Sequence, residues 1–298
     1  MKRFLVVVKR TKWERDLIRY GSAETARKVY ALQNDAYDRV FASHDRQKAN
    51  LEALQAALPA RYINRSELPF VAHSEYDFLV SFGGDNHFVY VSHFADHKPL
   101  LGLNSDPATS TGALLYFAPD DFLAAAQKLQ QGAAPRIEEW TRVEGTLDYP
   151  DGRRLRTGPC TSEITVRSQF HDYISRYLIV VGGQGELEEQ KCSGLLIATG
   201  AGSTGWYRNC QTRPDADYSF PKDAPFFRAI VREPGMRART SYRYLNPEVS
   251  EKEELRVISE MDGEITVDAN PDRTFDFPPG CVAAFRLAKD RLHIVHSV

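Results

Sequence analysis

Hydrophobic and polar positions follow different patterns in the two halves of the chain. In the first half, short continuous apolar runs alternate with helical stretches, and the runs occupy residues 4–8, 77–82 and 99–103. An unbroken apolar run of this length is typical of a strand buried on both faces of a parallel sheet. Residues 22–58 are rich in Ala, Leu, Gln, Lys and Arg, and 119–132 opens with Pro and two Asp and closes on Gly, so both stretches predict helices. We therefore expect a Rossmann-like α/β domain over residues 1–132.

The second half shows shorter runs and little helical periodicity. Apolar and polar residues alternate around 143–149, and Pro150-Asp151-Gly152 has the composition of a turn. Further expected strands are 161–167, 174–181, 195–199, 226–232, 255–259, 264–268, 281–287 and 291–296. Short strands at such spacing predict a mostly antiparallel, β-rich domain over residues 133–298.

Composition narrows the classes of function. Lys and Arg number 38 against 40 Asp and Glu, a formal charge of −2, which argues against nucleic-acid binding through bulk charge. No apolar run approaches the ~18 residues of a membrane span, and the run 4–8 is too short for a signal peptide. The four cysteines form no C-x-x-C pair, as expected for reduced thiols in a cytoplasmic protein.

Two loops of the first half carry candidate chemistry. Gly83-Gly84-Asp85 follows a buried strand directly, and Asn104 follows the next one. Because open α/β sheets hold their ligands at the carboxyl edge, a glycine turn there can bring N–H groups to a phosphate, with a carboxylate beside them. Taken alone, either loop is equally well explained as an ordinary turn.

A third loop is more specific. The apolar run that begins at Gly194 ends in Thr199-Gly-Ala-Gly-Ser-Thr-Gly-Trp206, which combines three glycines with hydroxyl groups and an aromatic ring. Such a segment can wrap a nucleotide, with hydroxyls for its polar edges and Trp206 for the face of a base. His87, His93 and His97 follow the Gly-Gly-Asp loop, and 93 and 97 would share a helical face. Two histidines at this spacing could bind zinc, but no motif such as His-Glu-x-x-His supplies a third ligand. We therefore interpret the three as surface or phosphate-side imidazoles.

The order of these loops resembles that of the NAD kinases, whose marks include a Gly-Gly-Asp-Gly loop, a Gly-x-Asn loop, an Asn-Glu pair and a late Asp-Gly. Residues 102–107 (Gly-Leu-Asn-Ser-Asp-Pro), 191–195 (Lys-Cys-Ser-Gly-Leu) and 232–234 (Arg-Glu-Pro) are similar in particular to the mitochondrial-type branch. The late Asp-Gly corresponds to Asp262-Gly263. The resemblance extends in the same order over roughly residues 77–290, which makes it more specific than any single motif.

The resemblance implies a role for each matching residue. Asp85 takes the position of the catalytic carboxylate. The phosphate- and ATP-binding positions are Gly83, Gly84 and Asn86. The NAD-binding positions are Asn104, Ser162, Glu163, Gly202, Ser203, Thr204, Gly205 and Trp206. No protein residue is implied as a metal ligand.

Three positions depart from the family pattern. Asn86 and His87 stand where the family has Gly and Thr, Ser162 replaces the Asn of the Asn-Glu pair, and Ser193 stands where many members have Asp. We expect Asn86 to have a positive φ, because the family's glycine suggests that conformation and Asn tolerates it better than most residues.

The function implied by the resemblance is transfer of a phosphoryl group from ATP, or polyphosphate, to the adenosine ribose 2′-hydroxyl of NAD, with Mg²⁺ accompanying ATP. It also implies a homodimer or larger homo-oligomer and a site in the cleft between the domains, with no nucleic-acid or membrane partner. Two alternatives remain open. One is a non-catalytic nucleotide-binding protein of the same fold, and the other is a lipid or sphingoid-base kinase, since those enzymes share the Gly-Gly-Asp loop.

Overall fold

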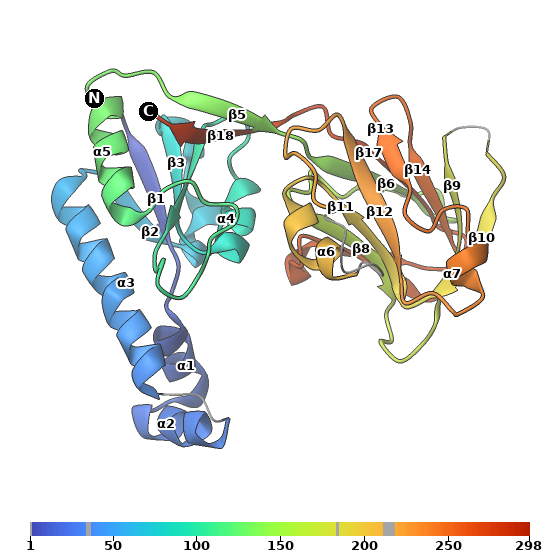
Figure 1. Ribbon diagram of the computed structural model, residues 1–298, viewed down its shortest axis with the longest axis horizontal. Coiled ribbons are helices and arrows are strands. Elements are labelled where there is room, and N and C mark those ends of the chain that lie inside the picture. Colours follow the sequence, from blue (N-terminus) through green and yellow to red (C-terminus); the bar gives the residue numbers. More distant parts are fainter. Residues whose placement is uncertain (1, 34–36, 183–184, 211–217) are drawn as a thin grey trace. The chain divides into compact units, whose positions relative to one another are not determined.

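The computed structural model describes residues 2–33, 37–182, 185–210 and 218–298. It divides into two compact units, one made of Met1–Glu138 with His293–Val298 and the other of Glu139–Leu292 (Figure 1). An N-terminal α/β region followed by antiparallel sheets confirms the fold class predicted from the sequence.

The first unit is built on a six-stranded sheet in the order β2-β1-β3-β4-β18-β5. Its strands are β1 (Phe4–Val8), β2 (Arg61–Asn64), β3 (Phe78–Gly83), β4 (Leu100–Asn104), β5 (Arg136–Trp140) and β18 (Leu292–Ser297). The pairs β2–β1, β1–β3, β3–β4 and β4–β18 are parallel. The helices are α1 (Lys12–Tyr20), α2 (Ala23–Leu32), α3 (Tyr37–Ala57), α4 (Asp85–Ser92) and α5 (Pro119–Gln130), with short 3₁₀ helices η1 (Arg65–Phe70) and η2 (His73–Glu75). Residues of β3 and β4 are buried throughout, as their unbroken apolar runs predict.

The last strand differs from the expectation. The run around 291–296 was expected to belong to the β-rich second domain, whereas β18 lies beside β4 in the sheet of the first unit. The contacts also divide the chain after Glu138, six residues beyond the predicted boundary at 132. Buried Leu292, Ile294 and Val295 satisfy either sheet equally well, so the apolar pattern alone does not choose between them.

The second unit consists of two antiparallel sheets. One has the order β10-β9-β14-β17-β6-β7 and the other β13-β12-β11-β8-β15-β16. The strands of the first are β6 (Val143–Asp148), β7 (Arg154–Arg156), β9 (Ser175–Val181), β10 (Glu188–Cys192), β14 (Leu255–Ser259) and β17 (Val282–Leu287). Those of the second are β8 (Glu163–Ser168), β11 (Gly194–Ala198), β12 (Phe226–Arg232), β13 (Glu248–Ser250), β15 (Gly263–Val267) and β16 (Thr274–Phe277). Short helices η3 (Gly202–Thr204), α6 (Trp206–Asn209), α7 (Ala238–Ser241) and η4 (Pro271–Arg273) join them.

A single apolar core fills the space between these two sheets. It includes Val143 and Phe285 from one sheet and Ile164 and Leu195 from the other. The opposite face of β11 is also covered, because Leu196 packs in a second cluster with residues that include Tyr207 of α6. Strand β11 is therefore buried on both faces, and the loop that follows it starts from a rigid element.

Candidate functional site

The Gly-Gly-Asp loop lies at the carboxyl end of β3. Gly84 is the N-cap of α4 and makes no side-chain capping bond, and Asp85 is the first residue of the helix. The unpaired N–H groups and the dipole of a helix N-terminus favour an anion. Strand pairing places Gly83 opposite Asn104 of β4, so the two loops predicted from the first half do meet at one edge of the sheet.

The carboxylate of Asp85 is held by backbone amides. Its Oδ2 accepts the N–H of Ala113 at 3.1 Å, and its Oδ1 accepts the N–H of Leu114 at 2.9 Å. Both oxygens are therefore oriented by the segment that follows β4. Each retains further lone pairs, since an ionised carboxylate can accept about four hydrogen bonds.

Asn104 organises that same segment. Its amide Nδ2 donates to the carbonyl of Ser110 at 2.8 Å, and its Oδ1 accepts the N–H of Asp106 at 3.1 Å. A Cβ on Gly112, which has φ +63°, would lie 2.8 Å from Asn104 Nδ2. Asn104 thus fixes the loop whose amides orient Asp85, and its predicted contact with the dinucleotide stays a prediction.

The expected positive φ at Asn86 is wrong. Asn86 is the second residue of α4 and is exposed, and it is absent from the described non-glycine residues with positive φ. Because Gly84 serves as the N-cap, the helix has already begun at this position. Asn86 therefore fits there without left-handed strain, for a different physical reason from the one expected.

Of the two interpretations of His87, a surface or a phosphate-side imidazole, the first is wrong. Its side chain is only 2% exposed, and Nε2 lies 2.9 Å from the carbonyl of Val7. A Cβ on Gly83 would lie 2.7 Å from the ring, so Gly83 is required by the imidazole that packs against it. The pKa of His87 is lowered to about 4, mainly by burial, while the bond to Val7 raises it and the charges of Arg65 and Lys9 lower it. Helix α4 ends at Ser92, so His93 and His97 share no helical face.

Lys9 is a residue of this edge that sequence reasoning missed. It follows β1, its N–H donates to the carbonyl of Phe82, and its Nζ lies 3.9 Å from the position of a Cβ on Gly84. Burial lowers the pKa of Lys9, as does the charge of Arg15, while Asp85 raises it. Lys9 also lines a groove of about 500 Å³. Its signal in the sequence was its position directly after a buried strand.

In the second unit, Ser162 and Glu163 lie against the Gly-rich loop. The hydroxyl of Thr199 donates to the carbonyls of Thr161 and Ser162, and a Cβ on Gly202 would lie 2.2 Å from the carbonyl oxygen of Ser162. Gly202 is therefore required by close backbone contact. The structure brings these predicted residues together within the second unit.

The residues of the Gly-rich loop divide into buried and exposed ones. Gly202 and Ser203 are buried, and the Ser203 hydroxyl donates to the carbonyl of Gly200 and accepts from the N–H of Phe220, so it stabilises the loop. Thr204, Gly205 and Trp206 are exposed. Only these three present their surfaces for a ligand in this conformation.

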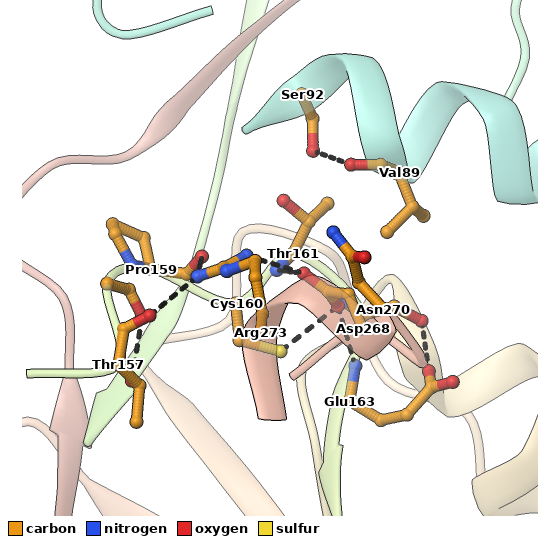
Figure 2. Close-up of polar contacts among 12 residues, drawn as sticks. Val89, Ser92, Thr157, Pro159, Cys160, Thr161, Glu163, Asp268, Asn270 and Arg273 are labelled. Carbon is orange, nitrogen blue, oxygen red and sulfur yellow. Dashed lines mark hydrogen bonds and ion pairs between the residues drawn. The ribbon is translucent and has the colours of Figure 1, made fainter. Parts of the chain in front are cut away.

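A buried carboxylate supports the Ser162–Glu163 pair (Figure 2). Asp268 has a fully buried side chain and accepts the backbone N–H groups of Thr161, Ser162 and Glu163 at 2.9, 2.6 and 3.1 Å. Its Oδ2 lies 3.7 Å from Nη1 of Arg273. Asp268 has φ +53°, a conformation that Asp tolerates. By contrast, Asp262 of the late Asp-Gly is exposed.

Glu163 is positioned for hydrogen bonding. It accepts the hydroxyl of Ser162. Burial raises the pKa of Glu163, the bond from Ser162 lowers it, and the charge of Asp268 raises it. Ser162 therefore retains a partnership with the glutamate despite replacing the family's Asn.

Glu163 and Trp206 line one groove of about 630 Å³ in the second unit. Its wall includes the aromatic side chains of Phe170, Tyr173 and Trp206, together with Arg167, His171, Arg232, Glu233 and Glu264. A groove that combines aromatic faces with both signs of charge suits a nucleotide, which offers a π-face, hydroxyls and phosphates.

Two solved structures with this fold are an NAD kinase and an NADH kinase. The NAD kinase of Archaeoglobus fulgidus in complex with ATP aligns with a TM-score of 0.61 and 18% identity, over 98% of this chain and 93% of that one. Yeast NADH kinase complexed with NADH aligns with a TM-score of 0.67 and 14% identity, over 100% of this chain and 84% of that one. The chain therefore has the fold of these kinases.

Curated proteins with similar sequences are also named NAD kinase. The NAD kinase of Chlorobium phaeobacteroides (strain BS1) is 26% identical over 159 residues, 53% of each chain. Mitochondrial NAD kinase 2 of Rattus norvegicus is 26% identical over 254 residues, 70% of this chain and 60% of that protein. The chain thus spans about half to three fifths of the length of these relatives. No protein-family model matches it. The resemblance to NAD kinases, including the mitochondrial type, is confirmed.

Proposed function

We propose that the protein is an NAD kinase, which transfers a phosphoryl group from ATP to the adenosine ribose 2′-hydroxyl of NAD and gives NADP. The observation that carries the proposal is the placement of Asp85 at the N-terminus of α4, oriented by two backbone amides and adjacent to Gly84. The similarity to curated NAD kinases supports it.

In this proposal Asp85 is the general base. The ribose oxygen attacks the terminal phosphorus of ATP, its proton passes to a carboxylate oxygen of Asp85, and ADP leaves. A positioned base of this kind contributes about 10²–10⁴ in rate. The fixed orientation of the carboxylate by Ala113 and Leu114 reduces its freedom to turn away from the hydroxyl.

The donor phosphates would lie at the start of α4. The N–H groups of Gly84, Asp85 and Asn86 precede the first intrahelical donors, since His87 and Phe88 donate to the carbonyl of Gly84. The ammonium of Lys9 adds a positive charge beside Gly84. Amides, dipole and ammonium together would offset the charge that develops in phosphoryl transfer.

Mg²⁺ fits this arrangement as a companion of ATP. Within residues 2–33, 37–182, 185–210 and 218–298, no group of three or more His, Cys, Asp or Glu could hold a metal ion. Mg²⁺ in such sites is bound largely by substrate phosphates and water, so the phosphates of ATP would hold it here and the Asp85 carboxylate remains the base. The ion would supply charge neutralisation on the phosphates.

The acceptor would occupy the groove of the second unit. Glu163 offers carboxylate oxygens to ribose hydroxyls, and the exposed face of Trp206 offers a stacking surface to adenine. Ser162, Gly202 and Ser203 would support this site through their contacts within the loop, and the exposed residues Thr204 and Gly205 would add to its surface.

One assay with several acceptors tests the proposal. Purified protein is incubated with Mg-ATP, or with polyphosphate, and NAD, diacylglycerol or a sphingoid base. We expect phosphate transfer to NAD alone, detected by an NADP-specific dehydrogenase. Transfer to a lipid would favour the lipid-kinase alternative. Binding of NAD by calorimetry without any transfer would favour the non-catalytic alternative.

We also propose a cytoplasmic location and a homodimer or larger homo-oligomer. No helix in the described part of the chain is long and apolar enough to cross a membrane. The four cysteines are free, which suits a reducing compartment. Fractionation of the native cells and light scattering of the purified protein test these two points. A membrane or organellar fraction, or a monomeric mass, would contradict them.

A further inference from the structure

Arg232 lies beside the predicted adenine-side tryptophan. It is the last residue of β12, and its guanidinium lies 4.4 Å from the centroid of the Trp206 ring. Both side chains line the 630 Å³ groove and also a second groove of about 660 Å³ next to it. Arg232 therefore forms part of the wall that separates the two grooves.

The backbone after Arg232 is held in an unusual conformation. Glu233 has φ +46°, although it is neither glycine nor asparagine and the next residue is Pro234. The residue before a proline favours an extended backbone, so this conformation persists only because its surroundings enforce it. Such strain is concentrated at ligand sites. The Arg-Glu-Pro sequence thus has a structural feature that strand formation does not explain.

Within the described part of the chain, the positive charge of Arg232 has no carboxylate partner, whereas that of Arg167 in the same groove has one. Arg167, which lines the same groove, has Nη2 at 2.5 Å from Oε1 of Glu264. Among the residues that the structure describes, no carboxylate lies within ion-pair distance of Arg232. Its interactions there are with the Trp206 ring and with the thiols of Cys192 and Cys210. Burial raises the pKa of both thiols, and the charge of Arg232 lowers it.

A guanidinium stacked on an indole keeps the N–H groups of its edge available. That edge matches the oxygens of a phosphate and can donate two parallel hydrogen bonds. The groove also contains Glu163, suited to ribose hydroxyls, and aromatic faces suited to a base. A ligand that matches all three is a nucleotide with a charged phosphate bridge.

We propose that Arg232 binds the pyrophosphate of the dinucleotide acceptor and is a positioning residue for it, with Trp206 fixing the guanidinium. This inference rests on the proposed function, because it takes NAD as the acceptor. Its consequence is a charge-dependent part of NAD affinity that adenosine lacks.

The test compares Arg232→Met with Arg228→Met. Arg228 is on the same strand and also stacks on aromatic rings, those of Phe220 and Phe226 at 5.1 Å, but it pairs with Glu248 and does not line the 630 Å³ groove. NAD affinity is measured by calorimetry at two salt concentrations, and adenosine affinity by ligand-observed NMR. Thermal melting checks that both variants fold.

We expect Arg232→Met to raise the Kd for NAD by about 10- to 100-fold, the range for loss of hydrogen bonds to a charged group. The salt dependence of NAD binding should weaken, and adenosine binding should change less than about threefold because adenosine carries no phosphate. Arg232→Lys should restore part of the affinity, and Arg228→Met should resemble the wild type.

Unchanged NAD affinity in a folded Arg232→Met, or equal losses for NAD and adenosine, would overturn the inference. If the wild type binds NAD with this Arg232 dependence but forms no NADP, the proposed function alone fails. If it forms NADP and Arg232→Met binds NAD normally, this inference alone fails. A wild type that does not bind NAD overturns both.

Discussion

Acidification should destabilise the first unit through His87. The imidazole lies under the Gly-Gly-Asp loop, packed against Gly83, with Nε2 facing the carbonyl of Val7. Because a carbonyl only accepts, Nε2 carries the hydrogen, and Nδ1 is left as a buried atom without a hydrogen-bond partner among the described residues. Protonation would place a charge on Nδ1 with no acceptor for it.

The size of the effect follows from the pKa of His87, which is about 4 in the folded protein against 6.5 for an ordinary histidine. Between these values the unfolded chain binds a proton and the folded chain does not, so stability falls as pH decreases from 6.5 to about 4. At about 1.4 kcal/mol per pH unit, the full interval corresponds to about 3 kcal/mol. Between pH 7 and pH 5 the expected loss is about 2 kcal/mol.

Urea unfolding at pH 7 and pH 5, followed by helical circular dichroism, measures this loss. In the described part of the chain, the five helices of eight or more residues, α1 to α5, are in the first unit, so that signal reports mainly on it. His87→Gln retains a donor for the carbonyl of Val7 and cannot titrate. Its free energy of unfolding should therefore fall by about 2 kcal/mol less than that of the wild type between pH 7 and pH 5. Equal pH dependence in both proteins would refute the reasoning. So would an NMR titration of wild-type His87 with a pKa near 6.5.

Three substitutions probe the two sets of site residues. Asp85→Asn should reduce turnover by about 10² or more while NAD affinity stays within a few fold, as steady-state kinetics and calorimetry would show; near-wild-type turnover would remove Asp85 from the mechanism. Trp206→Ala should raise the half-saturation concentration for NAD much more than that for ATP, and equal increases would contradict a stacking role. Asp268→Ala should lower the free energy of unfolding by about 3 kcal/mol, because half-buried Arg273 and three backbone N–H groups, those of Thr161, Ser162 and Glu163, lose their acceptor. Asp276→Ala, at an exposed position, should change it by less than about 0.5 kcal/mol. Similar unfolding curves for these two aspartate variants would contradict the supporting role of Asp268.

The pattern of apolar residues was sufficient to predict the fold class and most of the central strands. Unbroken runs gave the parallel strands β1, β3 and β4, and alternation such as that of Val143–Asp148 gave the antiparallel sheets. Periodicity identifies an element and its buried face. It does not say which sheet a strand joins. For that reason β18 was assigned to the β-rich domain, whereas it belongs to the sheet of the first unit.

The site was predicted in its motifs but not in its supporting contacts. The bond between His87 and Val7 spans 80 positions, and that between Asp268 and Ser162 spans 106, so no local pattern reveals either. The error at Asn86 has another origin. A glycine in a motif can be required either by a positive φ or by close packing. In this loop Gly83 is required because His87 packs against it, and the helix begins after Gly84. Position 86 is therefore inside the helix and needs no positive φ.

Phosphorus NMR of the reaction product tests the central claim most directly. Purified protein with Mg-ATP and NAD should yield ADP and a dinucleotide with one new phosphomonoester, coupled to the proton at the 2′ position of the adenosine ribose. Asp85→Asn should give the same signal far more slowly. No new phosphomonoester from NAD, or one at a position other than the 2′-hydroxyl, would contradict the account.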